Sequence, residues 1–210
     1  FNTASGTVRR IWIDSCQMIG VGRTNPSEWG GGWQNMWVTG GTLTGSKNGL
    51  YGDLIRGLQI DVVGSDAFSG AKMVVNCSVR KIDESGTEFH ADLMQFYALS
   101  TIENTIAYGL EMREPSNTQG LFSGNNISIK DVAFVDVSLD TRVSGVPFFL
   151  FAFMFAGPTN HMLVQNCAIF GPAIWRTDLA FSASDVVIRD TTWSNLPIPS
   201  PLAGVVVNND

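Results

Sequence analysis

An internal repeat constrains the fold of this chain more than any other feature of its sequence. In each copy, two apolar residues two positions apart precede a small or polar residue, and another apolar residue comes three positions after it. One copy reads Met162, Val164, Asn166 and Ile169. Other copies lie at residues 11–18, 36–43, 127–134 and 186–193, with Ser15, Gly40, Asp131 and Asp190 at the small or polar position.

Weaker copies extend the repeat through the middle of the chain. Val74, Asn76 and Val79 fit the pattern, although Lys72 occupies a position that should be apolar. Another copy runs through residues 55–60, and residues 102–112 hold one whose register we do not assign. The chain therefore contains about eight repeating units.

The spacing within the repeat predicts short β-strands. Side chains alternate between the two faces of a strand, so apolar residues two apart share one face. One unit cannot bury this face alone, and the units must therefore stack. We expect an all-β right-handed parallel β-helix of about eight coils, because parallel crossovers are right-handed. A β-sandwich or a β-propeller also has many short strands, but neither predicts one fixed register of inward residues.

Composition limits the domain organisation and the partners. The 210 residues, 44% of them hydrophobic, are enough for one large core. We expect a single domain over residues 1–195 and a tail at 196–210 that packs on the solenoid or caps it. The net charge of −6 argues against nucleic acid as a partner. The apolar run at residues 146–156 is shorter than the roughly 20 residues of a membrane-spanning helix, so we expect no membrane span.

The three cysteines, Cys16, Cys77 and Cys167, are distant from one another in the sequence and odd in number. This spacing argues against a disulfide framework and against a zinc site. We expect all three to be small, buried apolar residues.

Aspartates begin several strands that we expect after the repeat motif. If the strands of Asp66, Asp92 and Asp178 are in register, their carboxylates lie about 4.8 Å apart or at a small multiple of that distance. Stacked carboxylates can form an acid and base pair or a calcium site. We therefore expect Asp66 and Asp92 to be catalytic, and to be the calcium ligands if that metal is bound.

A histidine lies close to one of these aspartates. His90 and Asp92 are two residues apart, so on a strand they project from the same face. We expect His90 to act with Asp92 in acid and base catalysis, and Gln95, Arg176 and Asp178 to contact the substrate. The alternative is structural: Asp92 and Gln95 cap strand ends while His90 bonds a neighbouring coil.

Two tryptophans occupy matching positions in neighbouring repeats. Trp12 and Trp37 each lie between two inward residues, so both should point outward from adjacent coils. An exposed indole pair can bind a sugar, because the apolar face of a pyranose packs on the ring. The alternative is an aromatic ladder covered by a loop, since aromatic side chains usually pack.

The bends Asn-Cys-Ser-Val at residues 76–79 and Asn-Cys-Ala-Ile at 166–169, with GSDAFSG at 64–70 and FHADLMQF at 89–96, carry a family resemblance. They resemble the right-handed parallel β-helix repeat proteins, a superfamily that includes pectate lyases and polygalacturonases. The resemblance implies a polysaccharide lyase or a glycoside hydrolase that is extracellular, periplasmic or at the cell surface. The chain lacks the paired Asp-Asp, the Gly-His-Gly and the Arg-Ile-Lys of polygalacturonases, and no lyase motif identifies Arg113 or Arg176 as a base.

The segment from Phe148 to Phe155 is apolar on both faces of a strand. A solenoid strand needs only its inner face to be apolar, so something covers the outer face. A loop of the same chain or a second subunit would do so, and the second case predicts a homo-oligomer.

Together these features predict a carbohydrate-directed protein, with a polysaccharide or other glycan as its partner. The first hypothesis is a lyase or hydrolase for an acidic polysaccharide, with calcium as the cofactor to test. The alternative is a glycan-binding, adhesive or structural module without catalytic activity. An enzyme predicts a groove with clustered titratable groups, whereas an adhesive module predicts an exposed apolar face without them.

Overall fold

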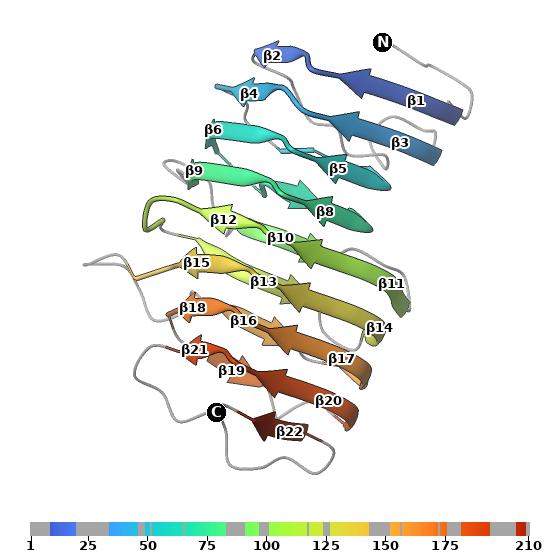
Figure 1. Ribbon diagram of the computed structural model, residues 1–210, viewed down its shortest axis with the longest axis vertical. Helices are drawn as coiled ribbons and strands as arrows, with labels where there is room; N and C mark the ends of the chain where they lie inside the picture. Colours follow the sequence, from blue (N-terminus) through green and yellow to red (C-terminus); the bar gives the residue numbers. More distant parts are fainter. Residues whose placement is uncertain are drawn as a thin grey trace.

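The chain forms an all-β structure of three parallel sheets (Figure 1). The structure, a computed structural model, describes residues 9–19, 34–45, 49–50, 52–64, 66–82, 91–96, 101–116, 118–123, 127–142, 152–155, 157–171, 173–175, 182–193 and 205–208. No helix in these ranges has the length and apolar character that crossing a membrane requires.

Sheet A is the largest and has nine strands in these ranges, all paired in parallel. In spatial order its strands are β1 (Arg9–Asp14), β3 (Gln34–Thr39), β5 (Leu54–Arg56), β8 (Met73–Val75), β11 (Thr101–Tyr108), β14 (Ser128–Val135), β17 (Thr159–Gln165), β20 (Ala183–Arg189) and β22 (Val205–Asn208).

Sheets B and C are built in the same way. Sheet B contains β2 (Gln17–Ile19), β4 (Thr42–Thr44), β6 (Gln59–Val63), β9 (Ser78–Ile82), β12 (Glu111–Met112), β15 (Ser138–Asp140), β18 (Ala168–Phe170) and β21 (Thr192–Trp193). Sheet C contains β7 (Phe68–Ser69), β10 (Asp92–Phe96), β13 (Gln119–Ser123), β16 (Phe153–Phe155) and β19 (Ala173–Trp175).

The chain visits the sheets in a fixed order. After β8 in sheet A come β9 in sheet B and β10 in sheet C, and β11 then pairs with β8. Each of the following repeats through β19 does the same. Equivalent residues of successive repeats therefore lie side by side in columns.

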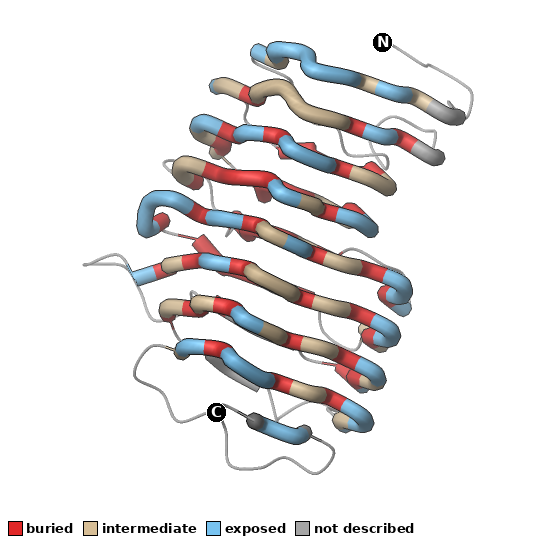
Figure 2. The backbone as a smooth tube through the Cα atoms, viewed as in Figure 1, coloured by how far each residue is buried: buried red, intermediate tan, exposed pale blue. Residues whose placement is uncertain are grey.

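The core consists of such columns of inward side chains. One column in sheet A is wholly buried from β3 to β20, with every side chain 0% exposed. Figure 2 shows the resulting alternation of buried and exposed positions along the strands. The members of this column are Val38, Ile55, Val74, Ala107, Phe134, Val164 and Ile188.

A residue with left-handed backbone conformation follows every strand of sheet A from β1 to β20. Gly, Asn and Asp adopt this conformation at the lowest cost, which explains their place in the repeat. Backbone pairing continues through the bend, since the N–H of Ser15 donates to Thr39 O at 2.7 Å. These bend residues are Ser15, Gly40, Gly57, Asn76, Gly109, Asp136, Asn166 and Asp190.

The predicted register of the copy at residues 127–134 is wrong by five positions. Val132 pairs with Met162, so the bend of this repeat is Asp136 and not Asp131. Asp131 also has a positive φ of 56°, but it lies within β14. The chain therefore contains two kinds of left-handed position, and the sequence pattern confused them.

The unassigned copy at residues 102–112 has its bend at Gly109. Its two inward positions before the bend hold Thr105 and Ala107, which are both buried. A polar residue and a small residue at these positions hide the apolar pattern in the sequence.

Cys77 and Cys167 are buried as predicted, but Cys16 is exposed. Cys16 lies between β1 and β2, which are the end strands of sheets A and B among the described residues. The prediction for Cys16 is wrong because, in the part of the chain that the structure describes, no strand of an earlier repeat lies beside it.

The last described strand extends sheet A. Val205–Asn208 pairs in parallel with β20, so this part of the tail covers the edge of that strand. The predicted oligomer contact from Phe148 to Phe155 lies mostly outside the described residues. Of it, Ala152 is buried, and β16 pairs with β13 and β19 on its two sides.

Two glycines with positive φ allow a test of the bend geometry. A Cβ on Gly41, at φ 89°, would collide with the carbonyl oxygen of Cys16, whereas a Cβ on Gly45, at φ 63°, would meet nothing within 4 Å. We expect Gly45→Ala to cost about 1–2 kcal/mol, the usual cost of a side chain in this conformation. Gly41→Ala should cost more because backbone must also move, and urea unfolding midpoints of the two variants measure the difference. Equal midpoints would contradict the close approach at Gly41.

Candidate functional site

Four neighbouring strands of sheet A carry an outward bulge at the same place. Glu103 pairs with Lys130 and Thr105 pairs with Val132, so Asn104 and Asp131 lie opposite each other without being ladder partners themselves. The same gap recurs between β14, β17 and β20. The inserted residues, which we call the bulge row, are Asn104, Asp131, His161 and Asp185, with φ of 54°, 56°, 51° and 53°.

The backbone explains which residues occupy the bulge row. Among residues other than glycine, Asn, Asp and His are the types enriched at positive φ. Because equivalent positions of paired strands lie about 4.8 Å apart, the side chains of the row are neighbours. A structural requirement thus brings titratable groups together on the surface.

His161 contacts a carboxylate on each side. Its Nδ1 lies 3.0 Å from Oδ1 of Asp131 on β14, and its Nε2 lies 3.3 Å from Oδ2 of Asp185 on β20. Carboxylates only accept hydrogen bonds, so a ring nitrogen of His161 that carries a hydrogen can donate it to the carboxylate beside it. Lys130 Nζ adds a cation 3.7 Å from Oδ2 of Asp131.

The row is open to solvent and lies in a shallow depression. The side chains of Asp131, His161 and Asp185 are 40%, 54% and 72% exposed. The depression has a volume of about 430 Å³, and apolar residues, including Leu163, line it together with these three. Arg189 also lines it, with Nη2 donating to Oε1 of Gln165 at 2.7 Å. The arrangement can present an acid, a base and a guanidinium to one ligand.

The structure brings the predicted residues Asp66 and Asp92 together. The backbone N–H of Asp92 donates to Oδ1 of Asp66 at 3.1 Å, and the hydroxyl of Ser69 donates to its Oδ2 at 3.0 Å. The two residues are only 8% and 0% exposed. Asp66 therefore caps the start of neighbouring strands in sheet C, and Gln119 is the next residue in register after Asp92.

The described atoms around Asp66 and Asp92 do not form a calcium site by themselves. Calcium takes six to eight oxygen ligands. Both carboxylate oxygens of Asp66 already accept a hydrogen bond, which leaves fewer of their lone pairs for a cation. Within the described ranges, no three His, Cys, Asp or Glu side chains converge on a point that could hold a metal.

The other predicted site residues are divided between described and masked parts of the chain. His90, Arg176 and Asp178 lie outside the described residues. Gln95 is half-buried on β10, in register with Ser69 of β7. It lies three residues from Asp92 and so faces the other side of the strand.

Trp12 and Trp37 point outward from adjacent strands, as the sequence predicts. They are in register and are 68% and 47% exposed. The indole Nε1 of Trp12 donates to Oγ1 of Thr39 at 2.8 Å, and that hydroxyl donates to Oδ1 of Asp14 at 2.5 Å. This chain of bonds holds the Trp12 indole over the outer surface of β3.

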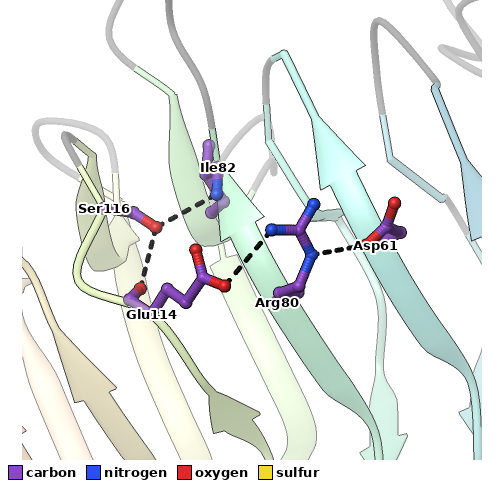
Figure 3. A network of polar contacts seen from close by, with 5 residues as sticks. All are labelled: Asp61, Arg80, Ile82, Glu114 and Ser116. Carbon is purple, nitrogen blue, oxygen red and sulfur yellow. Dashed lines mark hydrogen bonds and ion pairs between the residues drawn. The ribbon is translucent and has the colours of Figure 1, made fainter.

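A third polar group, on sheet B, is structural (Figure 3). Arg80 on β9 bonds Asp61 on β6 at 2.5 Å and Glu114, beyond β12, at 3.2 Å. These hydrogen bonds raise the pKa of the Arg80 guanidinium. Ser116 accepts from the N–H of Ile82 and donates to the carbonyl of Glu114. The network connects three repeats, and both of its carboxylates are paired with the guanidinium.

Sequence reasoning missed the bulge row, although the sequence carries a signal for it. Each member precedes the bend residue of its own repeat by five positions, as in 109 − 104 = 5 and 166 − 161 = 5. Polar residues of the Asn, Asp and His types recur at this offset in four successive repeats. Aligning the repeats on their bends would have revealed them.

Comparison with known proteins identifies no relative of the chain. A scan against protein-family models finds no match, and searches of curated proteins and of solved structures find no significant match. Functional inference therefore depends on the geometry of the chain.

The burial of two cysteines predicts a difference in thiol reactivity. Burial raises the pKa of the Cys77 thiol and raises that of Cys167 to about 11, so little thiolate exists at neutral pH. We expect iodoacetamide to label Cys16 in the folded protein and to label Cys77 and Cys167 only after denaturation. Peptide mass spectrometry measures the labelling. Rapid labelling of Cys167 at neutral pH in the folded protein would contradict the burial.

Proposed function

We propose that the chain is a right-handed parallel β-helix of about eight coils that binds and cleaves a polysaccharide on the outer face of sheet A. One observation carries the catalytic part, namely the contact of His161 with both Asp131 and Asp185 in an open depression. Carboxylate and imidazole groups that lie side by side at an open surface can exchange protons with a bound substrate.

The strand order supports the solenoid. Successive visits to sheets A, B and C, with every pairing parallel, are what winding in coils requires. The right hand follows from the general rule for parallel crossovers. The resemblance of the bends to pectate lyase-like proteins agrees with this fold and with action outside the cytoplasm, but fold alone does not transfer an activity.

The separation of the two carboxylates favours an inverting glycoside hydrolase. Asp131 and Asp185 lie on strands two apart, so their backbones are about 9.6 Å from each other. Both side chains lean toward His161, which lies between them. Inverting enzymes hold their carboxyl groups about 6.5–9.5 Å apart, and retaining enzymes about 5–5.5 Å apart.

Each residue of the site has a part in this reaction. One carboxyl group protonates the glycosidic oxygen, and the other takes a proton from the water that attacks the opposite face of the sugar. Before the substrate enters, the imidazole of His161 lies between the two carboxylates and holds them apart as a positioning residue. It must leave this space for the sugar and the attacking water. Arg189 offers its remaining donors to the carboxylate of an acidic sugar, since guanidinium groups bind carboxylates bidentately. No step requires calcium.

A non-catalytic glycan-binding or adhesive module is the second candidate. The exposed indoles of Trp12 and Trp37 favour it, because they offer an aromatic binding surface on two adjacent strands. Cleavage of a substrate separates the two functions.

Substitution of the carboxylates tests the proposed enzyme. We expect Asp131→Asn and Asp185→Asn each to lower the release of reducing ends from polygalacturonate by about 10²-fold or more. Asn accepts positive φ, so the bulge should survive. The control is Asp190→Asn, which alters an exposed aspartate of the same repeat at a bend.

Two outcomes would contradict the assignment. Full activity of both variants would remove the bulge row from the reaction. If instead Asp92→Asn abolishes release while Asp185→Asn does not, the reaction belongs to the site predicted around His90 and Asp92 in sheet C.

The stereochemistry of the product tests the carboxylate separation independently. We expect the new reducing end to appear first with the anomeric configuration opposite to that of the cleaved bond. Proton NMR of the early reaction in D₂O distinguishes the two anomers. Retention of configuration would show that the two groups do not act from opposite faces.

A further inference from the structure

An uninterrupted column of apolar side chains runs along the outer face of sheet A. Every strand of the sheet has an apolar residue at the outward position in register with Trp37. We call this column the apolar track; it begins at Trp12, passes Met73 and Leu163, and ends at Val206. Trp12, Met73 and Val206 are 68%, 44% and 52% exposed.

The core does not require this column. Outward positions of a sheet that faces solvent are normally polar, and the inward column from Val38 to Ile188 is already fully buried. A contiguous apolar surface that is kept along a whole sheet marks a site of interaction.

The shape of the track fits a linear ligand better than a protein. The track is narrow, with Thr39 beside it on one side and Asp131 and His161 on the other. At β8, β11 and β14 a second apolar or aromatic residue lies beside it, namely Val75, Tyr108 and Val135. Stable protein interfaces need about 800 Å² on each partner, over a broad patch. Eight strand spacings make the track about 38 Å long.

The track continues into the depression of the bulge row. Ala133, Leu163 and Val187 belong to the track, and all three line the depression together with His161. At the other end, the hydrogen bond to Thr39 holds the Trp12 indole in place. Binding of a ligand would therefore cost little conformational entropy of this side chain. Trp37 and β17 are five strand spacings apart, about 24 Å.

We propose that a linear polysaccharide lies along the apolar track, perpendicular to the strands, and that Trp12 and Trp37 form a distal subsite for it. The apolar faces of its sugar rings pack on the indoles, and its hydroxyl groups bond to Asp14 and Thr39 at their edge. The path of the polysaccharide through the bulge row rests on the proposed function, whereas its binding at the tryptophans does not.

Binding of intact polymers tests the proposal. The probes are polygalacturonate, xylan and hydroxyethylcellulose in affinity gel electrophoresis, with the Asp185→Asn protein so that the polymers stay intact. We expect the two further substitutions Trp12→Ala and Trp37→Ala, made together in the Asp185→Asn protein, to weaken binding of at least one polymer by about tenfold or more. The matched control, Ile19→Ala, removes a side chain that is 70% exposed on sheet B and should change nothing.

Chain length provides the second arm of the test. Oligosaccharides too short to span about 24 Å cannot reach from the point of cleavage beside His161 to Trp37, so their cleavage by the otherwise native enzyme should not change in the tryptophan variant. Cleavage of long chains should fall. Equal loss for short and long chains would overturn the proposal, because it would indicate general damage to the fold.

The remaining outcomes also decide. Failure of all three polymers to bind overturns the proposal, as does a loss of the same size in Ile19→Ala. If the wild-type protein sediments as a dimer and the tryptophan variant sediments as a monomer, the track is a contact with a second copy of the chain. This result would overturn the proposal too. Tryptophan-dependent binding without cleavage of any polymer would remove the proposed hydrolase and leave the subsite in place.

Discussion

In-register parallel pairing between successive repeats is the interaction on which the rest of this structure depends. It places each residue beside its equivalent in the next repeat, about 4.8 Å away. Each side chain therefore lies next to the equivalent side chains of the repeats on both sides. The inward column from Val38 to Ile188 is fully buried for this reason. The same pairing builds the outward features, because the bulge row and the apolar track are also columns.

Residues with left-handed backbone conformation occur at two kinds of place in sheet A, the bends and the bulges. At the bends they turn the chain from sheet A into sheet B without interrupting the hydrogen bonds, as at Asn166, whose N–H donates to Arg189 O at 3.2 Å. At the bulges they push an extra side chain outward while Val132 and Met162 keep their inward register. One conformational rule thus gives both the turn of the fold and the display of titratable groups.

Much of the fold could be predicted from the repeat, because apolar spacing reports directly on which side chains face inward. The outward position of Trp12 and the register of Asp66 with Asp92 follow from the same spacing. The register at Asp131 could not be predicted from one copy, since bend and bulge favour the same residue types. The burial of Asp92 could not be predicted either, because the pattern does not say which side of sheet C its strand presents to the core.

The stacked bulge restricts how such a site can change during evolution. β8 lacks the bulge and pairs with β11 only from Ile106 onward, beyond the inserted residue. A strand that gained or lost one residue among its bulged neighbours would therefore forfeit pairing on both sides. Gene duplication of an entire repeat copies the insertion together with its register, after which single substitutions at one codon per repeat can exchange Asn, Asp and His without disturbing the backbone.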